Sequence, residues 1–135
     1  MIHIQTTISA PILDVWEKYN NPDDIQQWNH ATDDWHCPKA ESEFIVGGHF
    51  SYTMAAKDGS FSFDFEGRFT EIIPEKQLSY EIADGRKVDM FFSEKDEQTH
   101  IDCDFEPETV NSEEMQQSGW QAILDNFKDY VENKK

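Results

Sequence analysis

The side chains best suited to chemistry gather in one short stretch, residues 30–37. It contains His30, Asp33, Asp34, His36 and Cys37, whose imidazole, carboxylate and thiolate groups all bind zinc. Zinc sites usually draw ligands from a compact pair such as Cys-x-x-Cys or His-x-x-x-His, and neither pair occurs here. We therefore expect no metal and no other cofactor. We interpret the stretch as a polar loop in which His30 or Trp35 hydrogen-bonds a ligand or closes over it.

Carboxylates are the second candidate for chemistry, because a pair of them can act as general acid and base. Asp64 and Glu66 look like such a pair, but strand alternation places both on a face expected to meet water. Four further acids are expected near strand or helix ends, close to a cavity rim: Glu71, Glu106, Glu108 and Glu114. The sequence has no Gly-x-Ser-x-Gly elbow, phosphate-binding glycine loop or dinucleotide fingerprint. We predict no catalytic residue, with acid–base catalysis by a rim glutamate as the alternative.

Residues 61–69 carry a large aromatic side chain at every second position except Gly67. Successive side chains of a strand point to opposite faces, so Phe61, Phe63, Phe65 and Phe69 should share one face. The opposite face is polar. This pattern predicts an antiparallel sheet covered on one side only, with Gly67 as a candidate β-bulge.

Six further runs predict the other strands of that sheet. They are residues 2–8, 41–46, 49–57, 78–82, 88–92 and 101–105. Turn signals separate them, and Asp84-Gly85 is the strongest signal for a tight hairpin.

Two short helices should follow the first strand. Ser9 is the expected cap of the first helix, with Pro11 in its first turn. Asn21 should cap the second helix, with Pro22 at its first position. Residues 29–39 show no periodicity and predict a loop.

A long helix is predicted over residues 112–132, starting with a capping-box pair of Asn111 and Glu114. At ~1.5 Å per residue it would span roughly 30 Å, enough to cross a small sheet. Its apolar stripe is Trp120, Ile123, Leu124, Phe127 and Val131, and its opposite face carries Gln117, Gln121, Asp125, Lys128 and Glu132. We expect Trp120 and Leu124 to face Phe63 and Phe65, and Lys134 and Lys135 to complement the helix dipole.

Length and charge bound the function. The 135 residues predict one domain, 1–135, and the net charge of −17 argues against nucleic acid and anionic membrane surfaces as partners. No apolar run is long enough to span a membrane, and the first residues lack the regions of a signal peptide. The two cysteines form no disulfide framework, so we expect reduced thiols and a cytoplasmic location.

Five groups of residues are spread over the whole chain at family-like spacings. They are Ser9-Ala-Pro11 with Val15-Trp16, Pro22 with Ile25 and Trp28, Gly47-Gly48-His-Phe50, Gly67 with Ile72 and Pro74, and Gly119-Trp120 before Leu124. In this set the chain resembles the activator of heat-shock-protein-90 ATPase homologue-like (AHSA-type) family of the START-like (SRPBCC) superfamily. The resemblance implies an α+β helix-grip fold, in which a seven-stranded antiparallel sheet curves around a long C-terminal helix in the order β-α-α-β-β-β-β-β-β-α. It also implies a cavity between sheet and helix.

We predict that a small hydrophobic molecule, lipid-, flavonoid-, sterol- or polyketide-like, binds in that cavity without catalysis. The predicted ligand-binding residues are Trp28, His30, Trp35, Tyr52, Met54, Phe63, Phe65, Tyr80, Met90, Phe92, Phe105, Trp120 and Leu124.

Two alternatives follow from the resemblance. One is an interaction module that acts on a chaperone ATPase, although the sequence lacks the second domain that such co-chaperones usually carry. The other is a polyketide cyclase/dehydratase-type enzyme. Exposed apolar residues on the outer face of the sheet would favour the interaction module, and an internal void would favour ligand binding.

Overall fold

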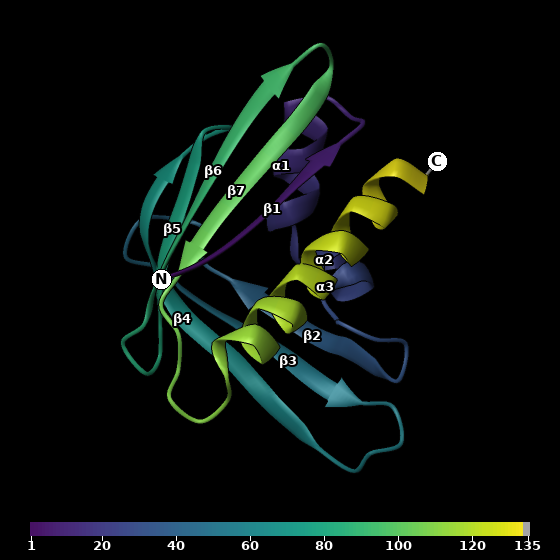
Figure 1. Cartoon of the computed structure of the whole chain (residues 1–135), viewed down its shortest axis with the longest axis vertical. Helices are drawn as coiled ribbons and strands as arrows, with labels where there is room; N and C mark the ends of the chain where they lie inside the picture. Colours follow the sequence, from purple (N-terminus) through teal and green to yellow (C-terminus); the bar gives the residue numbers. More distant parts are fainter. Residues whose placement is uncertain (134–135) are drawn as a thin grey trace.

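The alternation of apolar and polar residues produces one antiparallel sheet in the computed structural model, which describes residues 1–133 (Figure 1). The elements follow the predicted order: β1 (Ile2–Ile8), α1 (Ile12–Asn20), α2 (Pro22–Trp28), β2 (Trp35–Ser42), β3 (His49–Ala56), β4 (Ser62–Ile73), β5 (Gln77–Ile82), β6 (Lys87–Lys95), β7 (Gln98–Phe105) and α3 (Glu113–Asn133). The strand order is β1-β7-β6-β5-β4-β3-β2. The predicted helix-grip fold is confirmed. Lys134 and Lys135 lie outside the described residues.

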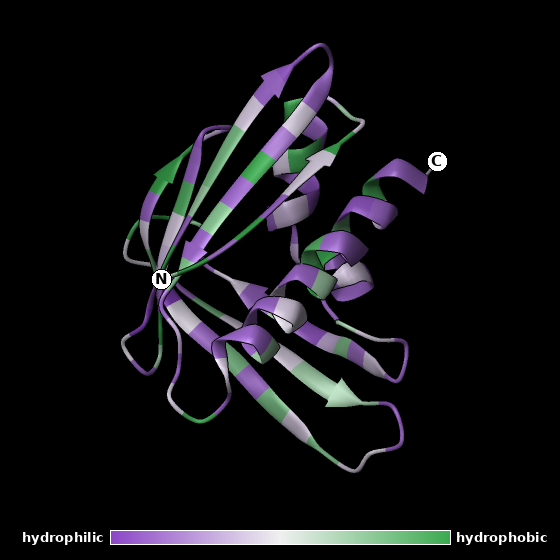
Figure 2. Ribbon diagram, viewed as in Figure 1, coloured by the Kyte–Doolittle hydropathy of each residue, from purple (hydrophilic) through white to green (hydrophobic). Residues whose placement is uncertain are grey.

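Hydrophobic and hydrophilic residues alternate along β6 and β7 (Figure 2). Except for Phe91, the apolar side chains of these strands point to the concave face, where Val88, Met90, Ile101 and Cys103 are almost fully buried. Except for the buried Thr99, the polar side chains point to the outer face. No helix within residues 1–133 is long and apolar enough to cross a membrane.

β4 confirms the shared aromatic face but places the irregularity elsewhere. Its pairing with β5 shifts between Phe69 and Glu71, so the bulge lies at Thr70 and not at Gly67. The bulge reverses the alternation, and Phe69 and Ile72 both face the core. Gly67 has another role, because it lies opposite Phe50 on β3, and a Cβ there would stand 2.7 Å from the Phe50 ring and 2.4 Å from the Glu81 carbonyl oxygen.

β2 begins earlier than predicted. The expected loop over residues 29–39 ends at residue 34, and the expected strand over 41–46 is misplaced, because the strand runs from Trp35 to Ser42. Its pairing with β3 shifts between His36 and Lys39, around Pro38, which removes the alternation that sequence analysis relies on.

The helix caps agree with the sequence only in part. Asn21 caps α2 as predicted, accepting a hydrogen bond from the Asp23 N–H at 3.0 Å. Ser9 does not cap α1, which begins after Pro11 and has its Ile12 N–H bound by the Glu94 carboxylate. Ser112 caps α3 by accepting from the Met115 N–H at 3.1 Å, in place of Asn111.

α3 lies along the edge strand β1 and hydrogen-bonds its backbone (Figure 1). Gln117 Nε2 donates to the His3 carbonyl at 3.0 Å, and Gln121 Nε2 donates to the Gln5 carbonyl at the same distance. Near the end of the helix, Glu132 accepts from the Ser9 N–H at 2.9 Å. Two side chains of the predicted polar face therefore bind groups that the edge strand leaves unpaired, and a third binds the residue that follows the strand.

The other side of α3 is joined to α2. Asn126 Nδ2 donates to the Trp28 carbonyl at 2.7 Å, and the Tyr130 hydroxyl donates to Asp24. The helix is thus fixed between β1 and α2, and it stands away from β3, β4 and β5.

Replacing Gly67 by alanine should lower the free energy of unfolding by about 1–3 kcal/mol, the usual cost of overpacking. The added Cβ meets a backbone carbonyl and an aromatic ring, neither of which can move freely. Urea denaturation measures the effect. Gly119→Ala is the matched control, because a Cβ there meets nothing within 4 Å, and it should stabilise α3 by roughly 0.5–1 kcal/mol.

Gln121 Oε1 also accepts from the Gln5 N–H, at 3.4 Å. Replacing Gln121 by methionine keeps the shape of the side chain but removes both hydrogen bonds to Gln5. We expect a loss of about 0.5–1.5 kcal/mol, together with faster hydrogen exchange at the Gln5 amide. Gln27→Met, at an exposed position of α2, is the control. Unchanged exchange at Gln5 would contradict the role assigned to Gln121.

Candidate functional site

A cavity of about 330 Å³ lies between the concave face of the sheet and α3. It exists because α3 is fixed to β1 and α2 at a distance from β3, β4 and β5. Most of its lining is apolar: Ile4, Trp28, Phe50, Met54, Phe63, Phe65, Phe69, Leu78, Met90, Trp120, Ile123 and Leu124. Its size and lining are typical of sites for small molecules.

Trp120 of α3 is positioned by aromatic contacts on two strands. Its ring stacks on Phe105 of β7 with centroids 3.9 Å apart and planes 11° apart. It meets Phe65 of β4 edge to face at 6.0 Å. The predicted approach of Trp120 to Phe65 is confirmed. These contacts fix the indole as part of the cavity wall.

Two phenol groups add hydroxyls to the apolar cavity wall. Tyr19 of α1 and Tyr80 of β5 line the cavity, and neither hydroxyl makes a hydrogen bond within residues 1–133. Burial raises the pKa of both hydroxyls well above the ordinary value of 10. Cys103 and Tyr52 raise both pKa values further, and Tyr19 also raises that of Tyr80. Both therefore remain neutral, and buried hydroxyls of this kind usually have a partner.

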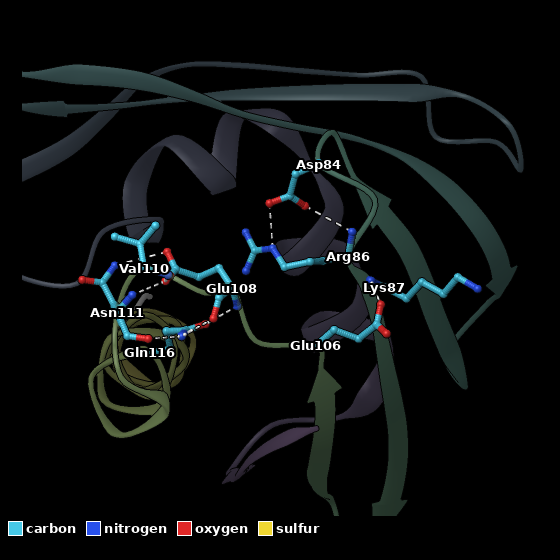
Figure 3. A network of polar contacts seen from close by, with 8 residues as sticks. All are labelled: Asp84, Arg86, Lys87, Glu106, Glu108, Val110, Asn111 and Gln116. Carbon is cyan, nitrogen blue, oxygen red and sulfur yellow. Dashed lines mark hydrogen bonds and ion pairs between the residues drawn. The ribbon is translucent and has the colours of Figure 1, made fainter.

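A cluster of polar residues lies at one end of the cavity, where the β5–β6 turn approaches the β7–α3 loop (Figure 3). Arg86 Nε donates to Asp84 Oδ2 at 2.8 Å, and the Arg86 N–H donates to Asp84 Oδ1 at 3.1 Å. Glu108 of the loop accepts from the N–H groups of Val110 and Asn111, and these hydrogen bonds, that from Asn111 above all, lower its pKa.

Gln116 ties this loop to α3. Its Oε1 accepts from the Glu108 N–H at 2.8 Å, and its Nε2 donates to the carbonyls of Glu108 and Asn111. Gln116 is buried, so its amide satisfies backbone groups that the loop would otherwise leave unpaired at the cavity end.

Nine of the thirteen predicted ligand-binding residues line the cavity. They are Trp28, Tyr52, Met54, Phe63, Phe65, Tyr80, Met90, Trp120 and Leu124. Phe63 is still 45% exposed, so it stands where the cavity opens to the outside.

The other four predicted residues do not line the cavity. Phe105 is covered by Trp120, and Phe92 is covered by Trp16 and Tyr19. Trp35, the first residue of β2, contacts Phe61 and Phe63. His30 contacts Asn126 of α3, outside the cavity lining.

Of the polar lining, the sequence placed only Glu108 near the cavity rim, and it did not predict Tyr19, Arg86, Asn111 and Gln116 as lining residues. Arg86 follows the Asp84-Gly85 turn signal, and nothing in the sequence indicates that this turn folds toward the cavity. Gln116 did leave a signal: it lies four residues before Trp120 and eight before Leu124, so it is a polar residue within the apolar stripe of α3.

The stretch 30–37 does not form a cluster of potential metal ligands. Within residues 1–133, no group of three or more His, Cys, Asp or Glu side chains is placed to hold a metal ion. Cys37 is buried, its thiol donates to the Lys39 carbonyl, and burial raises the pKa of the thiol to about 11.

The family described as Activator of Hsp90 ATPase homolog 1-like protein matches residues 9–132. The chain belongs to the AHSA1-like family. The AHSA1-like protein from Aeromonas hydrophila, solved by NMR, is 44% identical with a TM-score of 0.89 over 97% of this chain and 92% of that chain. A protein from Cytophaga hutchinsonii is 45% identical with a TM-score of 0.84, over 98% and 92%.

A more distant structure shares the fold alone. A protein from Nitrosomonas europaea has a TM-score of 0.82 at 15% identity, over 96% of this AHSA1-like chain and 92% of its own. Comparison with curated protein sequences finds no match. Membership in the AHSA1-like family is consistent with either a ligand-binding protein or an activator module.

His30 is the group in this AHSA1-like chain whose protonation should matter most near neutral pH. Its Nε2 faces Asn126 Nδ2 at 3.1 Å, and that nitrogen must be a donor because it also binds the Trp28 carbonyl. Nε2 therefore accepts, and the imidazole is neutral. Its Nδ1 is buried and has no partner within residues 1–133. Burial lowers the pKa of His30, Lys57 and His36 lower it further, and Asp33 partly opposes them.

Because the folded-state pKa of His30 is lowered, the unfolded chain binds its proton first as the pH falls. The free energy of unfolding should therefore decrease as the pH falls below about 6.5, the unperturbed value for histidine. His30→Gln should make the slope shallower between pH 7 and the onset of carboxylate titration, as measured by urea denaturation at several pH values. His49→Gln, at an exposed site, controls for the loss of one imidazole. An equal change in both variants would contradict this role of His30.

Proposed function

We propose that this protein binds a small, largely apolar molecule in the cavity between the sheet and α3, and does not transform it. The observation that carries the proposal is the cavity of about 330 Å³ with its aromatic and methionine lining. Burial of a ring-bearing ligand against Phe65, Tyr80 and Trp120 would remove apolar area from water.

The charge states of the lining groups support binding without catalysis. General acid–base catalysis works best with groups whose pKa lies near the operating pH. Here burial raises the pKa of the Tyr19, Tyr80 and Cys103 groups, while hydrogen bonds lower that of Glu108. These groups therefore keep one protonation state around neutral pH.

The alternative, an interaction module acting on a chaperone ATPase, finds less support on the outer face of the sheet. That face carries polar pairs between neighbouring strands, such as Thr53 with Asp64 and Ser79 with Asp89. Its exposed apolar residues include Ile73 and Phe91, both paired with Gln77. We also propose a cytoplasmic location, which the cysteine usage favours.

A titration followed by NMR tests the binding. Flavonoids, sterols, fatty acids and polyketide-like aromatics should be compared, and at least one class should shift the signals of cavity-lining residues and leave outer-face signals unchanged. At a hundredfold excess over the dissociation constant, the ligand should stabilise the fold by about 2.7 kcal/mol. Native mass spectrometry of the purified protein would identify a bound compound directly.

A pair of tryptophan variants gives the control. Ile123→Trp should fill the cavity and weaken binding at least about tenfold, the effect of losing roughly 1.4 kcal/mol. Phe91→Trp, on the outer face, should bind as the parent does. If no class of compound shifts cavity signals in the parent protein, ligand binding is wrong and the interaction module becomes the leading hypothesis.

A further inference from the structure

The guanidinium of Arg86 is the one positive group in the cavity lining within residues 1–133, and four of its five N–H donors are uncommitted. Only its Nε is engaged, by Asp84, and no hydrogen bond of its two Nη groups is formed within that part of the chain. The side chain is only 21% exposed. Its four Nη–H donors therefore remain available to a ligand at the edge of an apolar cavity.

Neighbouring carboxylates do not satisfy these donors. Asp84 binds Nε and the backbone N–H of Arg86, and the oxygens of Glu108 accept from its own loop. Figure 3 shows the guanidinium between these two residues, with interactions drawn only to Asp84.

Tyr80 adds a second uncommitted donor on the same side of the cavity. The residue is 8% exposed, and its hydroxyl has no hydrogen bond within residues 1–133. The field of Arg86 reaches it, since Arg86 opposes the rise of the Tyr80 pKa. Arg86 and Tyr80 together therefore present donors to a ligand that fills the apolar part.

The sign of the local charge decides which acceptor fits. One cation, Arg86, faces two carboxylates, Asp84 and Glu108, and the whole chain carries a charge of −17. An anionic ligand would add a third negative group and would have to lose its hydration in an apolar site. A neutral carbonyl oxygen accepts the same hydrogen bonds without either cost.

Building on the proposed function, we propose that the ligand is an apolar ring compound with a neutral carbonyl group, whose oxygen accepts hydrogen bonds from Arg86 and Tyr80. The rings lie against Trp120 and Phe65, and the carbonyl points to the end of the cavity where the β5–β6 turn approaches the β7–α3 loop. The preference is for ketones over carboxylates of the same skeleton.

Three probes with one ring system test this. 2-Acetylnaphthalene carries a neutral carbonyl, 2-naphthoate carries a carboxylate, and 2-ethylnaphthalene carries no acceptor. The ketone should bind about tenfold more tightly than the hydrocarbon, the factor expected for one hydrogen bond to a charged donor. The carboxylate should bind more weakly than the ketone. Dissociation constants come from NMR titration of the full chain at one fixed salt concentration.

Variants assign the effect to its residues. Arg86→Met should abolish the preference for the ketone, measured as the ratio of the dissociation constants of 2-ethylnaphthalene and 2-acetylnaphthalene. Tyr80→Phe should reduce the preference in part. Arg68→Met, which removes the same charge from the outer face, should keep the parent's preference.

The failures are distinguishable. Equal binding of ketone and hydrocarbon, or a preference that survives Arg86→Met, overturns the role of Arg86 but leaves the proposed function intact. Tightest binding of 2-naphthoate overturns the neutral carbonyl. If none of the three probes binds, the proposed function and this inference fall together.

Discussion

The hydrogen bonds between α3 and the backbone of β1 determine where the helix can lie. Gln117 and Gln121 bind the backbone of the first strand at His3 and Gln5, and Glu132 binds the Ser9 N–H just after it. A purely apolar helix would slide toward the centre of the concave face to bury more surface. Here the polar contacts hold it at the edge, and those of Asn126 and Tyr130 hold its other side on α2. The cavity is the space this arrangement leaves above β3, β4 and β5.

The cavity combines a surface suited to apolar rings with a small number of donors that remain neutral or cationic. Its hydroxyls and its thiol stay protonated because burial opposes their ionisation. Its carboxylate is already engaged by loop N–H groups. The interior therefore contrasts with the strongly acidic surface: the charge of −17 favours solubility, whereas recognition depends on a few groups near Arg86.

Sequence patterns predicted the order of elements, the aromatic face of β4 and the position of Trp120 in the cavity wall, because each depends on a simple period. They failed where the period breaks. The start of β2 was missed because the bulge near Pro38 removes alternation. The bulge of β4 was assigned to the wrong residue, since a glycine can serve close packing as well as a bulge.

The polar end of the cavity, apart from Glu108 near its rim, was missed for a different reason. A turn such as that at Asp84-Gly85 has a recognisable sequence, but its direction depends on sheet curvature, which no local pattern encodes. Likewise, Gln117 and Gln121 were assigned to a polar face without a partner, because an edge-strand backbone is invisible in side-chain periodicity. Of the nine lining residues that were predicted, all but Trp28 have positions that follow from strand alternation or from the apolar stripe of α3.

The two ends of the sheet have a consequence for how copies of this chain meet. An edge strand can recruit a strand from another molecule and begin aggregation. At β1, side chains of α3 already occupy the backbone groups that such a strand would need. At β2, α2 packs alongside, and Pro38 and the neighbouring bulge interrupt the straight ladder that strand addition requires. A chain at high concentration therefore lacks a regular edge for growth at either end of its sheet, within residues 1–133, and its strong negative charge keeps the copies apart.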